Sequence, residues 1–180
     1  MNRIEIPLSK TKISLLLAGA LAFVILGVLF IVTPDTFVTN IFRNPQTIRI
    51  VGIAAVIFFG AAGAYGLRKL FDKTIGLIID ENGITDNTNA SSVGLINWTD
   101  ITEIRTEEVM STKFLLIFID NPDKYLVKVN GFKRKLLKGN MKIYGTPLSI
   151  TSNTLKYDFN DLEKLIINRF NEEKERMPNR

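Results

Sequence analysis

Two long segments without a charged side chain constrain this sequence more than any other feature. Residues 13–33 and 50–67 contain no Asp, Glu, Lys or Arg, although charged residues make up 23% of the 180-residue chain. At about 1.5 Å per residue, each segment would form a helix of roughly 30 Å, the hydrocarbon thickness of a bilayer. A core helix of a soluble domain would be shorter and would carry a polar stripe. We therefore predict transmembrane helices over residues 13–33 and 48–68, joined by an external loop of residues 34–47.

A signal peptide is the alternative for the first segment, because Arg3, Lys10 and Lys12 precede it. Its apolar run is longer than the ~7–15 residues of a cleavable signal, and residues 32–35 lack the small-x-small cleavage pattern. We therefore expect an uncleaved anchor.

Lys and Arg placement predicts the orientation of the two helices. Three basic residues lie in residues 1–12 and three lie in residues 68–73, whereas only Arg43 and Arg49 lie between the two segments. Cytoplasmic flanks are enriched in Lys and Arg, so we expect an integral protein of the cell membrane with both termini in the cytosol and residues 1–12 as a cytosolic tail. Residues 1–73 carry a net charge of +5 and residues 74–180 a net charge of zero. This distribution reflects membrane topology, and we expect no nucleic-acid partner.

Small residues are frequent in the second apolar segment. Gly60 with Ala64, and Ala62 with Gly66, have the small-xxx-small spacing that lets membrane helices approach closely. The spacing is compatible with a homo-oligomer or a membrane-protein partner, and also with packing of the two spans against each other, which we favour.

The chain has no cysteine and no histidine. Their absence excludes thiolate nucleophiles, Cys/His zinc sites and imidazole bases. An acidic cluster of Asp100, Glu103, Glu107 and Glu108 has neither a partner base nor a metal-binding spacing. We expect no cofactor and no enzyme, with catalysis by this cluster as an alternative.

From residue 72 onward the pattern changes to short strands, which we predict at residues 75–80, 84–88, 93–98, 101–106, 112–120 and 147–151. Asn82 and Gly83 form the strongest hairpin signal in the chain. A second hairpin is expected around Thr99 and Asp100, and residues 112–120 are apolar enough to be a central strand.

The last predicted element is a helix that begins with Asn160 as its N-cap and Glu163 closing a capping box. Leu162, Ile166 and Phe170 follow at helical spacing. Residues 173–180 are expected to be a charged tail.

Three of these segments carry a resemblance to a known family: IIDENGI at residues 78–84, INWTDITEI at residues 96–104, and the helix after SNTL at residues 152–155. Together they resemble the uncharacterised bacterial pleckstrin-homology-like (PH-like) domains that follow paired transmembrane helices. The resemblance covers residues 72–172. It implies an α+β membrane protein of the bacterial inner membrane, with an antiparallel β-barrel closed by a C-terminal helix, Trp98 in the core and no catalytic residues.

Residues 121–144 are too long for a hairpin loop of such a barrel. The dipeptide Asn121-Pro122 is typical of a helix start, so we predict one helix from there, a break near Asn130 and Gly131, and a second helix over about 132–143. The alternative is a turn at 121–124 followed by a strand at 125–129.

The second helix of this insertion divides into two faces. Residues 124–142 carry seven basic and no acidic side chains, while residues 74–123 carry a net charge of −7. On a helical wheel one half-circle is apolar and the opposite arc is basic. The apolar set is Phe132, Leu136, Leu137, Met141, Ile143 and Tyr144, and the basic set is Arg134, Lys135, Lys138 and Lys142, with Lys133 on the apolar side.

The basic residues suggest two interpretations. They contact anionic phospholipid headgroups, or they form a solvated face that balances the acidic strands. Our hypothesis is a non-enzymatic membrane-anchored module that binds protein partners or anionic lipid at the cytoplasmic face. A structural subunit acting through its transmembrane helices is the alternative.

Overall fold

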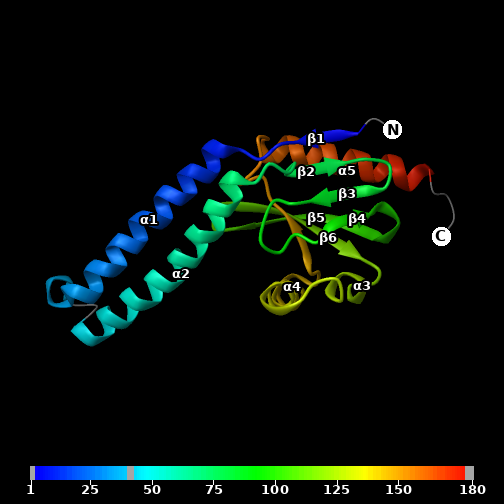
Figure 1. Ribbon diagram of the computed structural model, residues 1–180. Helices are drawn as coiled ribbons and strands as arrows, with labels where there is room; N and C mark the ends of the chain where they lie inside the picture. The colour runs from blue at the N-terminus through cyan, green and yellow to red at the C-terminus, as the bar shows by residue number, and fades with distance from the viewer. Residues whose placement is uncertain (1–2, 40–42, 177–180) are drawn as a thin grey trace. The chain divides into compact units, whose positions relative to one another are not determined.

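The computed structural model describes residues 3–39 and 43–176 (Figure 1). The chain forms two compact units: residues 10–73 make one, and residues up to 9 combine with those from 74 onward to make the other. The first unit holds two long apolar helices and the second holds two antiparallel sheets with helices. The predicted α+β class with two apolar helices is thereby confirmed.

The helical unit consists of α1 (Lys10–Val32), a short 3-10 helix η1 (Pro34–Phe37) and α2 (Pro45–Phe71). Asn44 caps α2 by accepting a hydrogen bond from the backbone N–H of Gln46 at 2.9 Å, and Pro45 occupies its first turn. Both long helices are apolar enough to cross a membrane, and only 6% of each apolar window is buried. A core helix of a soluble protein would be mostly buried.

The backbones of α1 and α2 come into contact at Gly27 and Gly52. A methyl group added to Gly52 would lie 2.6 Å from the carbonyl oxygen of Gly27 and 2.8 Å from Cβ of Phe30. Phe23 and Phe59 stack with ring centroids 4.3 Å apart. The two helices therefore pair through glycines that allow backbone contact.

One sheet contains four strands in sequential order: β1 (Ile4–Ile6), β2 (Leu77–Ile79), β3 (Gly83–Asp86) and β4 (Gly94–Asn97). β1 lies within the segment expected to be a tail. It pairs antiparallel with β2, with Ile4 opposite Ile79. The segments before and after the helical unit therefore share one sheet.

The other sheet has the order β5 (Ile101–Val109), β6 (Thr112–Ile119) and β7 (Leu148–Ile150). β6 is central, as its apolar sequence predicted. The hairpin expected around Thr99 and Asp100 is wrong: the 3-10 helix η2 (Trp98–Asp100) carries the chain from one sheet to the other. Among the described residues no strand ladder joins the two sheets, so barrel closure is not seen.

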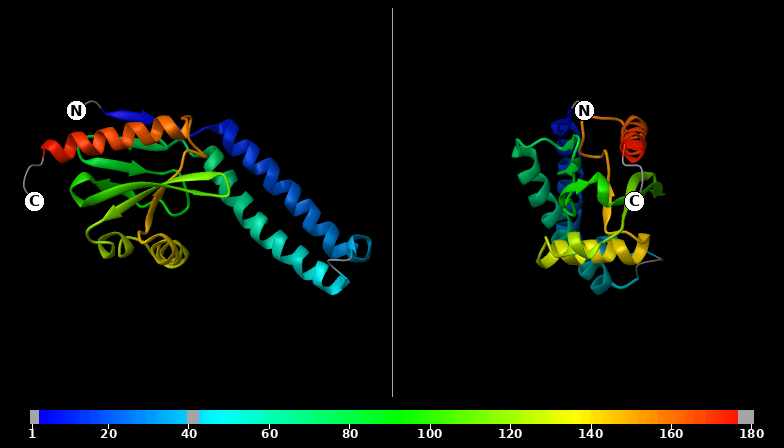
Figure 2. Two further views of the ribbon diagram at one scale, coloured as in Figure 1. Left: turned by 180° about the vertical axis from the view of Figure 1, so that it is seen from behind. Right: turned by 90° about the vertical axis from the view of Figure 1, so that its right-hand side faces the viewer.

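Three helices complete this unit: α3 (Asp123–Leu126), α4 (Gly131–Tyr144) and α5 (Phe159–Arg176). The insertion is helical as predicted, and the alternative strand at 125–129 does not form. α5 and α4 lie on opposite sides of the strands (Figures 1 and 2). Leu162 and Ile166 of α5 are fully buried with strand residues such as Leu77 and Ile117.

The predicted cap of α5 is wrong by two residues. The helix begins at Phe159, and the carboxylate of Asp158 accepts a hydrogen bond from the backbone N–H of Asn160 at 2.8 Å. Glu163 does not close a capping box but accepts a hydrogen bond from the hydroxyl of Thr106 on β5. α5 continues to Arg176 through part of the expected tail, whose last four residues lie outside the described part.

We predict that Gly83→Ala destabilises the sheet unit by about 2 kcal/mol or more, because the added methyl group would lie 2.0 Å from the carbonyl oxygen of Ile96. Gly83 also has a φ of +156°. Urea unfolding in detergent, followed by the fluorescence of the single tryptophan, the buried Trp98, would measure the change. Gly139→Ala is the matched control because its added methyl group meets no atom within 4 Å. Equal stability of the two variants would contradict this account of the turn.

Candidate functional site

The five predicted basic residues all lie on α4. Asn130 precedes the helix, Leu137 is its buried residue, and Gly145 ends it in a left-handed conformation with φ +78°. Lys133, which lies on the apolar side of the wheel, is half-buried. The four side chains of the predicted basic arc are exposed, namely Arg134, Lys135, Lys138 and Lys142.

Within the described residues, no ion pair includes these five basic side chains. Two acidic residues of the preceding segment pair with other basic side chains: Glu103 pairs with Arg105 at 2.9 Å, and Asp100 pairs with Lys124 at 2.6 Å. On α5, Arg169 and Arg176 each pair with a glutamate of the same helix. α4 is thus a helix whose positive charge is not balanced by direct contacts.

The apolar half-circle predicted for α4 is not buried as a whole. Leu137 is fully buried and Leu136 and Tyr144 are half-buried, whereas Phe132 is 73% and Ile143 72% exposed. These side chains are exposed because α4 contacts the rest of the sheet unit along a narrow strip, in which Leu137 is the buried residue. Phe132 and Ile143 lie on the flank of the helix, beyond that strip.

A buried polar network attaches the insertion to η2. The carboxylate of Asp100 accepts hydrogen bonds from Lys124 Nζ at 2.6 and 2.8 Å and from the hydroxyl of Tyr125 at 2.6 Å. Asn97 donates a fourth hydrogen bond at 3.1 Å through its side-chain amide. Both Asp100 and Tyr125 are buried. The network joins the start of α3 to the turn between the sheets.

This network shifts the pKa of both of its acidic groups. Burial alone would raise the pKa of Asp100, but the hydrogen bonds from its donors outweigh burial and lower the pKa to about 2. Burial, and then the hydrogen bond to Asp100, raise the pKa of Tyr125 above its usual range. Asp100 is therefore a charged structural group at neutral pH.

The acidic cluster considered for catalysis is dispersed. Asp100 is engaged in the buried network, Glu103 is paired with Arg105, and Glu107 and Glu108 are exposed on β5. In the part of the chain that the structure describes, no group of three or more His, Cys, Asp or Glu side chains is placed to hold a metal ion.

The small residues of α2 that we named for helix packing differ in their surroundings: Gly66 faces Leu17 of α1, whereas Gly60 and Ala64 border a groove. Gly60 and Ala64 line an open apolar groove of about 400 Å³ together with Leu17 and Leu21 of α1. A methyl group on Gly60 would meet no atom within 4 Å, whereas one on Gly66 would lie 3.1 Å from Leu17. Ala62 is exposed. Backbone contact between the two helices is at Gly27 and Gly52.

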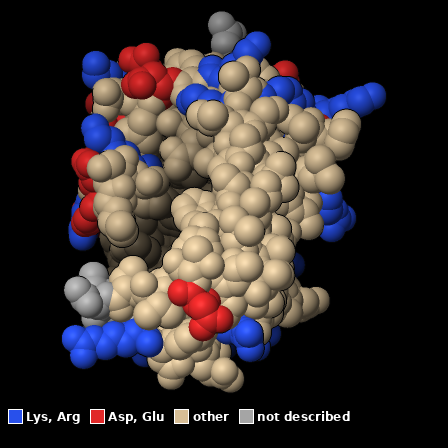
Figure 3. Space-filling view, turned by 90° about the vertical axis from the view of Figure 1, so that its left-hand side faces the viewer, with Lys and Arg blue, Asp and Glu red and all other residues tan. Residues whose placement is uncertain are grey.

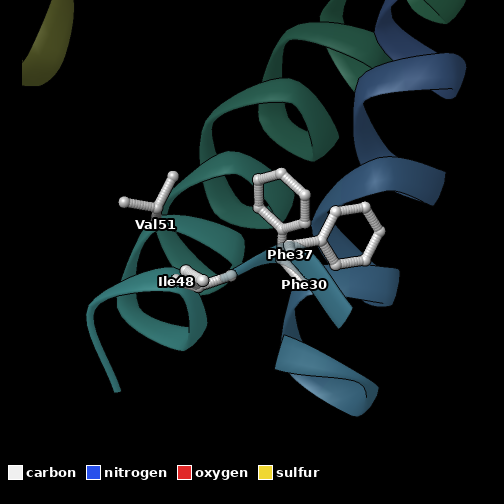
Figure 4. Close-up of a pocket in the computed structure, with 4 residues that line it drawn as sticks. All are labelled: Phe30, Phe37, Ile48 and Val51. Atoms are coloured by element: carbon white, nitrogen blue, oxygen red, sulfur yellow. The ribbon is translucent and has the colours of Figure 1, made fainter. Parts of the chain in front are cut away.

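The surface of the helical unit is uncharged over most of its length. Figure 3 shows a broad tan surface with one red group in its lower part and blue atoms toward its edges. Near the loop, Phe30, Phe37, Ile48 and Val51 surround a cavity of about 60 Å³ (Figure 4). Ligand pockets usually enclose about 300–1,000 Å³, so this cavity is a packing feature.

No known protein family, curated protein or solved structure matches this chain.

We predict that Asp100→Asn lowers the stability of the sheet unit by about 1–3 kcal/mol at neutral pH, because a buried charged hydrogen-bond acceptor is lost. The folded pKa of about 2 lies below the ordinary value of 3.8, so the carboxylate contributes fully above pH 3.8 and its contribution is lost as pH falls through 2. The difference between the two proteins, measured by urea unfolding, should be constant from about pH 5 to 7 and shrink toward pH 2. Tyr125→Phe removes one donor and should cost less. A pH-independent difference would contradict the charged role of Asp100.

Proposed function

We propose that this chain is a non-enzymatic, membrane-anchored module whose α4 binds anionic lipid headgroups at the cytoplasmic face. The observation that carries the proposal is the set of four exposed basic side chains on α4 that form no ion pair within the described residues. A polybasic segment gains about 1 kcal/mol per Lys or Arg near an anionic surface. The scattered acidic residues support a binding role over catalysis.

The connectivity supports an anchored domain on one side of the membrane. β1 precedes α1 and β2 follows α2, yet the two strands pair residue by residue. A sheet cannot form across a bilayer, so two membrane-crossing helices must return the chain to the side from which it left. The Lys and Arg bias of the flanks supports the cytosol as that side.

A PH-like domain is part of this proposal. Its support is the run of antiparallel strands followed by α5, which buries its apolar stripe against them. The family resemblance suggests the bacterial inner membrane as the location.

The second candidate function is a structural subunit that contacts a membrane-protein partner or another copy of itself. The groove lined by Gly60 and Ala64 favours it, because small residues leave room for a further helix.

The topology can be tested with single cysteines, since the chain has none of its own. We expect Thr39→Cys to react with an impermeant maleimide on intact cells, because residue 39 lies in the loop between the helices. Gly139→Cys on α4 should react only after the cells are permeabilised. The opposite pattern would place the sheet unit outside.

Lipid binding can be tested with the full chain in nanodiscs, using Gly139→Cys with an environment-sensitive fluorophore. Gly139 is exposed on α4, and an added side chain meets no atom within 4 Å. We expect the fluorescence emission to shift to the blue with anionic lipid and to stay unchanged with neutral lipid. The shift should fade between about 0.01 and 0.15 M salt as the Debye length falls from ~30 to ~8 Å.

The variant that tests the charge changes Arg134, Lys135, Lys138 and Lys142 to Gln. It should lose the shift and keep its thermal stability, since solvated charges contribute little to folding. The matched control removes the same number of charges from α5 by changing Lys164, Arg169, Lys174 and Arg176 to Gln, and it should keep the shift. Loss of the shift in both variants, or in neither, would contradict specific binding by α4.

A further inference from the structure

Exposed apolar side chains are concentrated in the insertion. In the described part of the sheet unit, four large apolar side chains are more than three-fifths exposed: Met110, Val127, Phe132 and Ile143. All but Met110 lie in residues 121–144. The two on α4 are the largest of the three in the insertion and flank the basic residues along the sequence.

Phe132 and Ile143, the two most exposed apolar side chains of α4, lie along one line of the helix surface. Phe132, Leu136 and Ile143 are spaced i, i+4 and i+11, which places them within about 40° of one another at 100° per residue. Gly139 lies between this line and Lys135 and Lys142. The exposed surface of α4 therefore has an apolar sector beside a basic sector.

From this arrangement we infer that Phe132 and Ile143 enter the bilayer at the boundary between headgroups and acyl chains, while the neighbouring basic side chains reach the phosphates. The inference rests on the proposed function and deepens it. A helix that lies in the membrane interface has this pattern of an apolar edge beside Lys and Arg. Long basic side chains can keep their charge in the headgroup layer while their stems cover apolar surface.

The positive charge on the exposed surface of α4 favours a bilayer as its binding partner. An apolar sector flanked by unbalanced positive charge complements a surface that is anionic outside and apolar within. α5 provides the contrast in the same unit, because its apolar residues Leu162 and Ile166 are buried and its arginines are paired. α5 lies on the opposite side of the strands from α4 (Figure 2).

Insertion predicts a component of binding that salt does not remove. Contacts between charges weaken at high salt, where the Debye length is ~3 Å at about 1 M. Burial of an apolar side chain is not screened. The bound state of α4 should therefore persist in part at high salt, and the remaining part should depend on Phe132 and Ile143.

The depth to which positions 132 and 143 enter the bilayer can be measured with the full chain in nanodiscs that contain anionic lipid. Phe132→Cys and Ile143→Cys, each carrying a fluorophore, should be quenched by lipids with a nitroxide on the acyl chain and be protected from aqueous iodide. Asn168→Cys on the exposed face of α5 is the control and should show the reverse. Labels at 132 and 143 as open to iodide as the label at 168 would overturn the inference.

The second measurement follows the fluorophore at Gly139→Cys in a chain that also carries Phe132→Ser and Ile143→Ser. We expect the blue shift to remain at low salt, and the ratio of bound to unbound α4 at about 1 M salt to fall at least about tenfold below that of the unsubstituted α4, because the apolar burial that screening leaves intact is lost. Unfolding followed by Trp98 fluorescence checks that the variant is folded. An unchanged salt titration would overturn insertion.

The outcomes separate the two proposals. A label at 139 that responds to anionic lipid, with labels at 132 and 143 in water, leaves headgroup binding in place and refutes insertion. A label at 139 that never responds refutes both. Labels at 132 and 143 that are protected from iodide even in neutral nanodiscs, without quenching by lipid nitroxides, would assign the apolar sector to a protein contact and refute insertion.

Discussion

The pairing of β1 with β2 is the constraint on which the architecture depends, because these strands flank the two apolar helices. Ile4 lies opposite Ile79 and Ile6 opposite Leu77, so the edge of the first sheet is completed only when the chain before α1 and the chain after α2 meet. Closing a long loop normally costs conformational entropy. Here the loop is a helical hairpin whose backbones touch at Gly27 and Gly52, and the hairpin itself brings its two ends together. Helix pairing and sheet completion therefore support each other.

The second organising feature is the turn at Trp98 and Asp100, where the chain changes sheets. The indole N–H of Trp98 donates to the carbonyl oxygen of Asp80 at 2.8 Å, which ties this turn to the β2–β3 turn. The carboxylate of Asp100 binds Lys124 and Tyr125 and holds the start of the insertion. One buried charge is thus fully compensated inside the unit, while the charges of α4, further along the same insertion, face outward.

How much the sequence predicts depends on the range of the interactions involved. The apolar segments, the turn at Gly83 and the break before α4 were predictable, because each follows from local composition or from a residue with special backbone freedom. β1 was not, since three residues carry no measurable period and their partner is about seventy residues away. The same limit applies to glycine: Gly52 and Gly60 look alike in the sequence, and only the path of α1 decides that Gly52 is in contact and Gly60 open. For the site, the basic arc of α4 was visible in the sequence, but the exposure of Phe132 and Ile143 depends on how narrowly α4 rests on the unit.

Tethering changes what a binding site on this unit needs to be. A free domain must gain enough from its ligand to offset the loss of translational freedom, which usually requires an enclosed pocket or several well-defined contacts. On the proposed function, the sheet unit is joined at Thr74 to a membrane-crossing helix and meets its bilayer at an effective concentration that a short linker raises to the millimolar range. Contacts of about 1 kcal/mol per basic side chain then suffice to hold α4 at the surface. On the proposed function, an open helix face with four unpaired cations is a complete site, and its low affinity per contact leaves it responsive to the lipid composition around the anchor.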